Sequence, residues 1–168
     1  MTTPVDTNLD LVLKRELAVP VNLVWRGLTE PGLLKQWFVP KPWRIADCRV
    51  DLRPGGEFYT VMEDPEGKEF PTTGCFLEII KEKRLVWTSV LHGNYRPAPS
   101  PATGNKECAH IAMTAIIELE ALSSGTRYTA HAMHNAPEQK KAHEDMGFHD
   151  GWGTTVTQLE ELLKQEEK

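Results

Sequence analysis

Apolar and polar residues alternate from Leu9 to Leu17, where four leucines share one face and Arg15 interrupts their series. A period of two predicts a half-buried β-strand. After Pro20 the apolar positions take helical spacing, and Thr29 and Pro31 supply a cap and a first-turn proline for a restart. We therefore predict one strand followed by two short helices that meet at a bend.

The middle of the chain returns to the alternation of strands. Two strands joined by a Pro-Gly-Gly hairpin turn are predicted in 48–64, and two more around a polar turn in 72–91. The proline-rich stretch 92–107 has no periodicity and is predicted to be a long surface loop. Further strands are predicted in 108–121 and 126–134, which gives about seven strands in all.

The end of the chain, from Pro137 to Lys168, has helical spacing that starts loosely and becomes amphipathic from Phe148 onward. Strands connected by hairpins form an antiparallel sheet, and the terminal helix is the only large predicted element free to cover one of its faces. We predict an α+β protein in which a long C-terminal helix lies across the concave face of a curved sheet. Residues 1–8 are predicted to be an N-terminal tail and 9–168 a single domain.

Composition narrows the classes of function only modestly. A chain of 168 residues can bury a substantial core, and its net charge of -5 argues against nucleic acid as the main partner. Cys48, Cys75 and Cys108 lie far apart without metal-type or disulfide-type spacing, which predicts free thiols in a reducing cytoplasm. No secretory signal and no apolar run of the ~20 residues that span a membrane are present, so we expect a cytoplasmic protein without a membrane partner.

Five segments occur in an order that resembles a known family: ELAVPVNLVWRGLTEPGLLKQWF (16–38), DLRPGGEF (51–58), GCFLEIIKEKRLVWT (74–88), SSGTRYT (123–129) and DGWGTTVTQLEELL (150–163). Together they resemble the SRPBCC (START-like) superfamily, and within it the branch named activator of heat-shock-protein-90 ATPase homologue-like. The resemblance extends from about Leu9 to Leu163. It implies the helix-grip (Bet v-like) fold, with a cavity between the sheet and the long helix. The matching motifs are structural and carry no catalytic signature, so catalytic residues stay unassigned.

Two regions are predicted to leave room for that cavity. Gly153 interrupts the packing stripe of the terminal helix, and a glycine there costs roughly 1 kcal/mol against alanine. Close packing on a strand or space for a ligand would each explain this cost. The last strand has two faces, one with Ala130, Ala132 and His134 and one with His131. Periodicity does not decide between them, and likeness to the family pattern selects the alanine face as the inward one.

The large apolar residues are candidates for the walls of an apolar pocket, although each alone is more typical of a solid core. The set predicted to surround the cavity is Arg15, Trp25, Trp37, Phe38, Phe58, Met62, Trp87, Met113, Ala130, Ala132, His149, Trp152, Gly153 and Val156. Tyr95, in the proline-rich loop, is a candidate to reach into the mouth of the cavity, with the loop acting as a lid.

Polar candidates are few. Arg15 is in phase with buried leucines, so we expect it at the mouth of the strand, paired with a carboxylate, or holding an anionic ligand. His149 is predicted to be a rim histidine, a hydrogen-bonding partner of a ligand or a general base. The other histidines lack the i, i+4 spacing of a metal site, and no nucleophile motif is present. We expect no metal and no cofactor.

Three functions remain open. The first is a non-enzymatic protein that binds a small hydrophobic molecule, lipid-like or aromatic, in an apolar cavity. The second is an enzyme of the polyketide cyclase or hydrolase type, which requires at least two polar side chains to converge inside the cavity. The third is a module that interacts with a chaperone, which would favour an exposed apolar patch on the outer face of the sheet. A homodimer formed through that outer face is also possible.

Overall fold

The computed structural model describes residues 3–99 and 111–167. Seven strands form one antiparallel sheet in the order β1-β9-β8-β5-β4-β3-β2. Their bounds are β1 Asp10–Leu17, β2 Arg44–Val50, β3 Glu57–Glu63, β4 Glu69–Ile80, β5 Arg84–Thr88, β8 Thr114–Leu122 and β9 Gly125–Met133. A second, two-stranded sheet pairs β6 (Leu91–His92) with β7 (Arg96–Pro97) around the short 3-10 turn η1 (Gly93–Tyr95).

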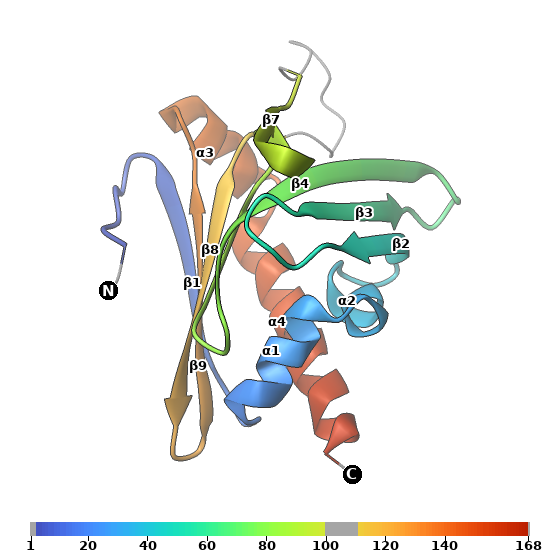
Figure 1. Cartoon of the computed structure of the whole chain (residues 1–168), viewed down its shortest axis with the longest axis vertical. Helices are drawn as coiled ribbons and strands as arrows, with labels where there is room; N and C mark the ends of the chain where they lie inside the picture. The colour runs from blue at the N-terminus through green and yellow to red at the C-terminus, as the bar shows by residue number, and fades with distance from the viewer. Residues whose placement is uncertain (1–2, 100–110, 168) are drawn as a thin grey trace.

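Four α-helices complete the described fold. They are α1 Val21–Thr29, α2 Pro31–Trp37, α3 Pro137–Asp145 and α4 Phe148–Glu166. The sheet bends around α4, and α1 and α2 pack beside that helix (Figure 1). The predicted α+β helix-grip architecture, with about seven strands and a long terminal helix, is confirmed. None of the helices in the described ranges is long and apolar enough to cross a membrane.

Alternation in the sequence did not decide which face of β9 points inward, and the structure does. Tyr128, Ala130 and Ala132 are buried within the hydrophobic core, and they face α4 rather than solvent. His131 lies on the opposite face of the same strand. Ala130 and Ala132 have no exposed surface, so the core beneath this face of β9 is solid.

The C-terminal helical region is divided in two at Gly147. This residue has φ +91°, a left-handed conformation that glycine adopts without the steric penalty of a side chain. The turn ends α3 at Asp145 and starts α4 at Phe148. The single loosely starting helix predicted from Pro137 is therefore two helices, and both of them contribute to one wall of the interior.

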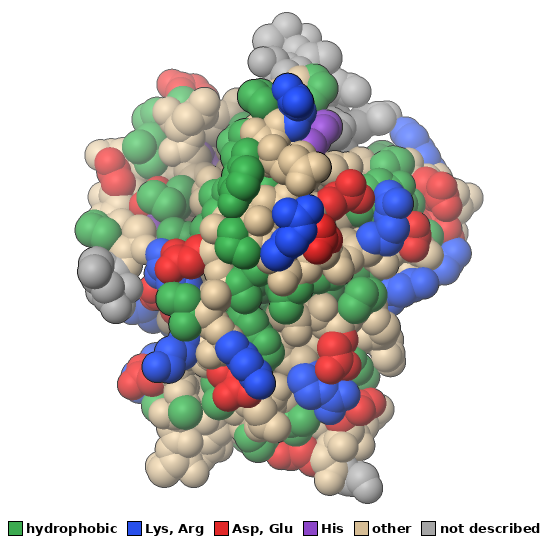
Figure 2. All heavy atoms as spheres, in the orientation of Figure 1, with side chains coloured by type: hydrophobic (Ala, Val, Ile, Leu, Met, Phe, Trp, Pro, Cys, Tyr) green, Lys and Arg blue, Asp and Glu red, His purple; other side chains and the backbone are tan. Residues whose placement is uncertain are grey.

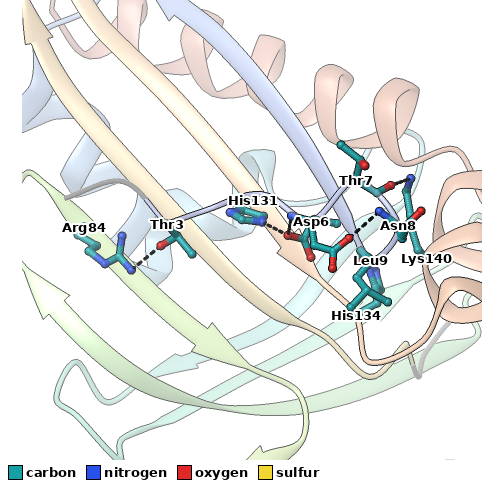
Figure 3. Close-up of polar contacts among 10 residues, drawn as sticks. Thr3, Asp6, Thr7, Asn8, Leu9, Arg84, His131, His134 and Lys140 are labelled. Carbon is teal, nitrogen blue, oxygen red and sulfur yellow. Dashed lines mark hydrogen bonds and ion pairs between the residues drawn. The ribbon is translucent and has the colours of Figure 1, made fainter.

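The N-terminal segment 3–9 lies across the outer face of the sheet (Figure 3). Arg84 Nη2, on β5, donates a hydrogen bond of 3.1 Å to Thr3 Oγ1. On the same outer side, His131 Nε2 lies 2.8 Å from Asp10 Oδ2, and both side chains are buried. Within the predicted tail, Thr3 is therefore held on β5, whereas residues 4–8 are exposed.

Two of the sequence predictions fall partly outside the described residues. The proline-rich loop contains β6, η1 and β7, but 100–110 lie outside the described ranges. Cys108 lies in that stretch, whereas Cys48 and Cys75 are buried free thiols. Burial raises the pKa of the Cys48 thiol to about 11.

Candidate functional site

A pocket with a volume of about 520 Å³ lies between the sheet, the end of α2 and the junction of α3 with α4. The inward residues of β3, β4 and β5 form one wall, and side chains from α3 and α4 form the other. Lys41 and Met146 belong to the lining and are exposed, so they mark where the pocket reaches solvent. On the face seen in Figure 2, hydrophobic side chains run down the middle with charged side chains on both sides.

Aromatic rings centred on Phe58 form the sheet wall. The ring centroid of Phe58 lies 5.1 Å from that of Phe76, 5.3 Å from that of Trp87 and 5.5 Å from that of Phe38. Phe58 and Met62 face inward because they alternate on β3 with outward residues. The rings support one another in edge-to-face and stacked contacts, which makes this wall rigid.

Trp37 closes the pocket at the end of α2. Its indole Nε1 donates a hydrogen bond of 2.8 Å to the carbonyl oxygen of Gly27 in α1, so its polar edge is satisfied although the residue is buried. Its ring packs edge-on against Phe38, with the centroids 5.5 Å apart. The bend between the two short helices thereby places two aromatic side chains on the pocket.

The helix wall is a second aromatic cluster. The ring centroids of Phe148 and Trp152 are 4.7 Å apart, and the imidazole of His143 lies 5.2 Å from the first and 5.8 Å from the second. Gly151 lies on the same wall, and a Cβ placed there would meet no heavy atom within 4 Å. The gap in α4 that opens onto the pocket is therefore Gly151.

His143 belongs to a short hydrogen-bonded series. Its Nδ1 lies 2.9 Å from His134 Nε2, and His134 Nδ1 lies 2.8 Å from the carbonyl oxygen of Leu9. Figure 3 shows His134 next to Leu9 at the point where the N-terminal segment enters β1. Burial, and then the charge repulsion of His134, lowers the pKa of His143 to about 4, so this imidazole is neutral at physiological pH.

Apart from the indole N–H groups of the tryptophans, the remaining polar side chains of the lining are hydroxyls. They are Thr60, Thr72, Ser89, Tyr128 and Thr155. Ser89 Oγ donates to the carbonyl oxygen of Ile111 at 2.9 Å, whereas Thr72 Oγ1 is buried without a hydrogen-bond partner in the described structure. Burial raises the pKa of Tyr128, which keeps its phenol protonated. The lining thus offers an apolar surface with a few neutral polar points.

Half of the residues predicted to surround a cavity line this pocket. They are Trp37, Phe38, Phe58, Met62, Trp87, Met113 and Trp152. Trp25, Ala130, Ala132 and Val156 lie in the solid core instead. Alternation and helical spacing identify buried positions. They do not show which residues pack in the core and which line the pocket.

The absence of a side chain at Gly153 is explained by the position of Arg15. A Cβ at Gly153 would come within 2.9 Å of Arg15 Nη2, so the missing side chain makes room for the guanidinium and not for the pocket. Arg15 lies on the edge strand β1, is exposed, and donates from Nη1 to the carbonyl oxygen of Lys14 at 3.1 Å. No carboxylate of the described residues pairs with it. Arg15 is therefore an exposed residue of an edge strand and does not line the pocket.

Two further candidates lie outside the lining. His149 is exposed on α4 and packs edge-on against Phe148, with the ring centroids 5.1 Å apart. Tyr95 is exposed and lies over Gly55, where a Cβ would come within 2.7 Å of its ring. The imidazole on the pocket wall is His143. Sequence placed its partner His134 on the inward face of the last strand but gave no sign that the two rings meet.

The outer face of the sheet is charged in its described part. Cross-strand ion pairs join Arg84 to Glu78 and Glu118, and Arg127 to Glu16 and Glu120. The exposed pairs of Arg127 contribute little to stability individually, about 0–1 kcal/mol each, whereas those of Arg84 are partly buried. They occupy the surface on which an exposed apolar patch was expected for a chaperone partner.

Comparison with known proteins places this fold in context. The family model described as "Activator of Hsp90 ATPase homolog 1-like protein" matches residues 18–164. The crystal structure of protein NE0264 from Nitrosomonas europaea is 71% identical, with a TM-score of 0.90 over 97% of this chain and 99% of that one. A Rhodobacter sphaeroides protein is 19% identical (TM-score 0.78, covering 95% and 94%), and an AHSA1-like protein from Aeromonas hydrophila is 16% identical (TM-score 0.68, also covering 95% and 94%). These last two show a shared fold. No functionally curated protein matches the chain significantly.

Proposed function

We propose that this chain, which belongs to the family of Activator of Hsp90 ATPase homolog 1-like proteins, binds a small and mainly apolar molecule in the pocket beneath the start of α4. The observation that carries the proposal is the pocket itself: about 520 Å³ walled by two aromatic clusters. Binding sites for small molecules typically measure about 300–1,000 Å³ and combine apolar walls with a few polar groups.

The placement of the pocket also favours ligand binding over loose packing. Its aromatic walls are held by the Trp37 hydrogen bond, by the Phe58 ring contacts and by the Gly147 turn. A rigid cavity is already shaped for its occupant, so the cost of ordering side chains on binding is small. A pocket that arose from poor packing would instead be lined by residues free to collapse into it.

The decisive test fills the pocket at Gly151. Because a Cβ there meets open space, Gly151→Leu projects a side chain into the pocket without an initial clash. Replacing a helical glycine also adds up to about 1 kcal/mol of stability. The matched control is Gly32→Leu on α2, where a Cβ likewise meets nothing within 4 Å and which does not line the pocket.

The measurement is native mass spectrometry with extraction of any bound molecule, followed by thermal denaturation against a library of lipids and aromatic compounds. A ligand present at 100 times its Kd stabilises by about 2.7 kcal/mol, which raises the midpoint of a chain this size by about 5–10 °C. We expect this rise in the native protein and in Gly32→Leu but not in Gly151→Leu. An empty native protein whose midpoint no compound moves would refute the proposal, and a chaperone partner, as in the family's description, would then be tested.

An enzyme of the cyclase type is the weaker alternative. Several polar groups do line the pocket, which is the condition set for it, and His143 is the base among them. A general base works best when its pKa lies near the operating pH. With a pKa of about 4, His143 accepts a proton too weakly to drive proton abstraction at neutral pH. Its properties suit a hydrogen-bond acceptor that positions a ligand.

A further inference from the structure

The hydrogen bonds at the helix wall determine which nitrogen of His143 carries its proton. The carbonyl oxygen of Leu9 can only accept, so His134 Nδ1 must donate to it. In a neutral ring the other nitrogen is then an acceptor, and His134 Nε2 must receive its hydrogen from His143 Nδ1. Burial of His143 lowers its pKa and so favours the neutral form of this ring. His143 Nε2 is therefore left with a lone pair and no proton.

That lone pair has no partner among the described residues. The ring of His143 is held on the pocket wall by Phe148 and Trp152, so it cannot turn to find a partner elsewhere. Thr72 Oγ1, on the sheet wall, is a buried polar atom without a hydrogen bond in the described structure. Both His143 Nε2 and Thr72 Oγ1 are therefore available to bond a ligand in the pocket.

The charge of the lining restricts this ligand further. Lys41 is the one charged side chain among the described lining residues, and it is exposed where the pocket meets solvent. A carboxylate or phosphate bound beside His143 would lose its hydration. It would also form no hydrogen bond with His143 Nε2, because the anion and the unprotonated nitrogen are both acceptors. A group that fits is neutral and carries a hydrogen-bond donor, as a hydroxyl does.

We propose that the pocket selects neutral hydroxyl compounds, alcohols or phenols on an apolar body, whose O–H donates to His143 Nε2. This rests on the proposed function, since it names the polar group of the molecule bound there. His134 and the Leu9 carbonyl act as positioning groups that fix the tautomer.

The test compares three naphthalenes of similar shape. 2-Naphthol is a neutral phenol at pH 7, 2-methoxynaphthalene has the same oxygen without its hydrogen, and 2-naphthoate is an anion. Their Kd values are measured by calorimetric titration for the native protein, His143→Phe and His149→Phe. His143→Phe retains an aromatic ring without the acceptor, and His149→Phe is the matched control for an exposed histidine of α4.

We expect the native protein and His149→Phe to bind 2-naphthol about tenfold more tightly than 2-methoxynaphthalene, the worth of one good buried hydrogen bond. In His143→Phe the ratio should fall to about one, through weaker binding of 2-naphthol. An unchanged ratio in His143→Phe, or tightest binding of 2-naphthoate to the native protein, would overturn the hydroxyl preference while leaving ligand binding intact. No binding of any of the three would overturn the proposed function and this preference with it.

A second measurement does not depend on a variant that folds. Long-range ¹H–¹⁵N spectra of the native protein distinguish a protonated ring nitrogen from a bare one. The hydrogen-bonded series requires Nδ1 of His143 to be protonated and Nε2 to be bare. The opposite tautomer would remove the acceptor from the pocket and refute the inference directly.

Discussion

The burial of His143 makes the stability of the protein depend on pH in a defined window. Its pKa is about 4 in the folded protein and near 6.5 in the unfolded chain. Between these values the unfolded chain binds a proton that the folded protein does not. The free energy of unfolding therefore falls as the pH is lowered from about 6.5 to about 4. Above pH 6.5 both states are neutral at this residue and its contribution is constant.

The size of the effect follows from the difference in pKa. About 2.5 pKa units correspond to about 3.4 kcal/mol at 1.36 kcal/mol per unit. The ring lies beside a pocket that reaches solvent, and solvent screening reduces this figure by roughly half, to about 1.5–2 kcal/mol. For a protein with a typical stability of about 5–15 kcal/mol, such a loss is readily measured.

The assay is urea denaturation from pH 7.5 to pH 4.5 on the native protein and on His143→Phe. Carboxylates titrate in both proteins, so the informative quantity is the difference between their two pH profiles. We expect His143→Phe to be about 1 kcal/mol less stable at pH 7.5, because His134 Nε2 loses its donor. Between pH 7.5 and pH 4.5, the free energy of unfolding of His143→Phe should fall by about 1.5–2 kcal/mol less than that of the native protein. Parallel profiles would refute the assigned burial of the neutral imidazole.

Three further substitutions test the packing through urea denaturation. Gly27→Ala should lower the free energy of unfolding by about 1–2 kcal/mol, although alanine has the better helix propensity. The reason is that its Cβ would come within 2.6 Å of Leu159 Cδ1 in the core. A stabilised variant would contradict the close approach of α1 to α4. Gly153→Ala should instead gain about 0.5–1 kcal/mol, since the flexible Arg15 guanidinium can move aside, and it should leave any pocket ligand bound. Trp37→Phe should cost about 2–4 kcal/mol, because it leaves the Gly27 carbonyl without its donor and removes ring volume; a neutral result would show that the hydrogen bond is unimportant.

The fold was predictable because its signals are local. Alternation over Leu9–Leu17, a Pro-Gly-Gly turn and helical spacing after Phe148 each depend on residues close together in the chain. Antiparallel order then follows from short connections. The division of the C-terminal region at Gly147 was missed because a glycine between two helical stretches is consistent with either a weak helix or a turn.

The pocket was predictable only in part, since its walls depend on tertiary distance. Phe58, Met62 and Trp87 were found because inward strand positions can be counted. On the terminal helix, Gly151 and Gly153 look alike in sequence, two positions apart on the same element. The structure separates them through what lies opposite: open space at Gly151 and a guanidinium at Gly153.

The polar anchor of the pocket was beyond sequence reasoning for a physical reason. His134 and His143 are nine residues apart across the end of a strand and a turn, so no periodic pattern brings their rings together. Their roles depend on a third group, the Leu9 carbonyl, which is supplied by the backbone and is therefore invisible in the identity of any residue. Because this carbonyl directs the protons of both rings, the chemical character of the pocket wall is set by where the chain enters β1. A substitution at His134 that cannot accept from His143, such as His134→Phe, should therefore weaken the preference for 2-naphthol over 2-methoxynaphthalene even though His134 does not line the pocket.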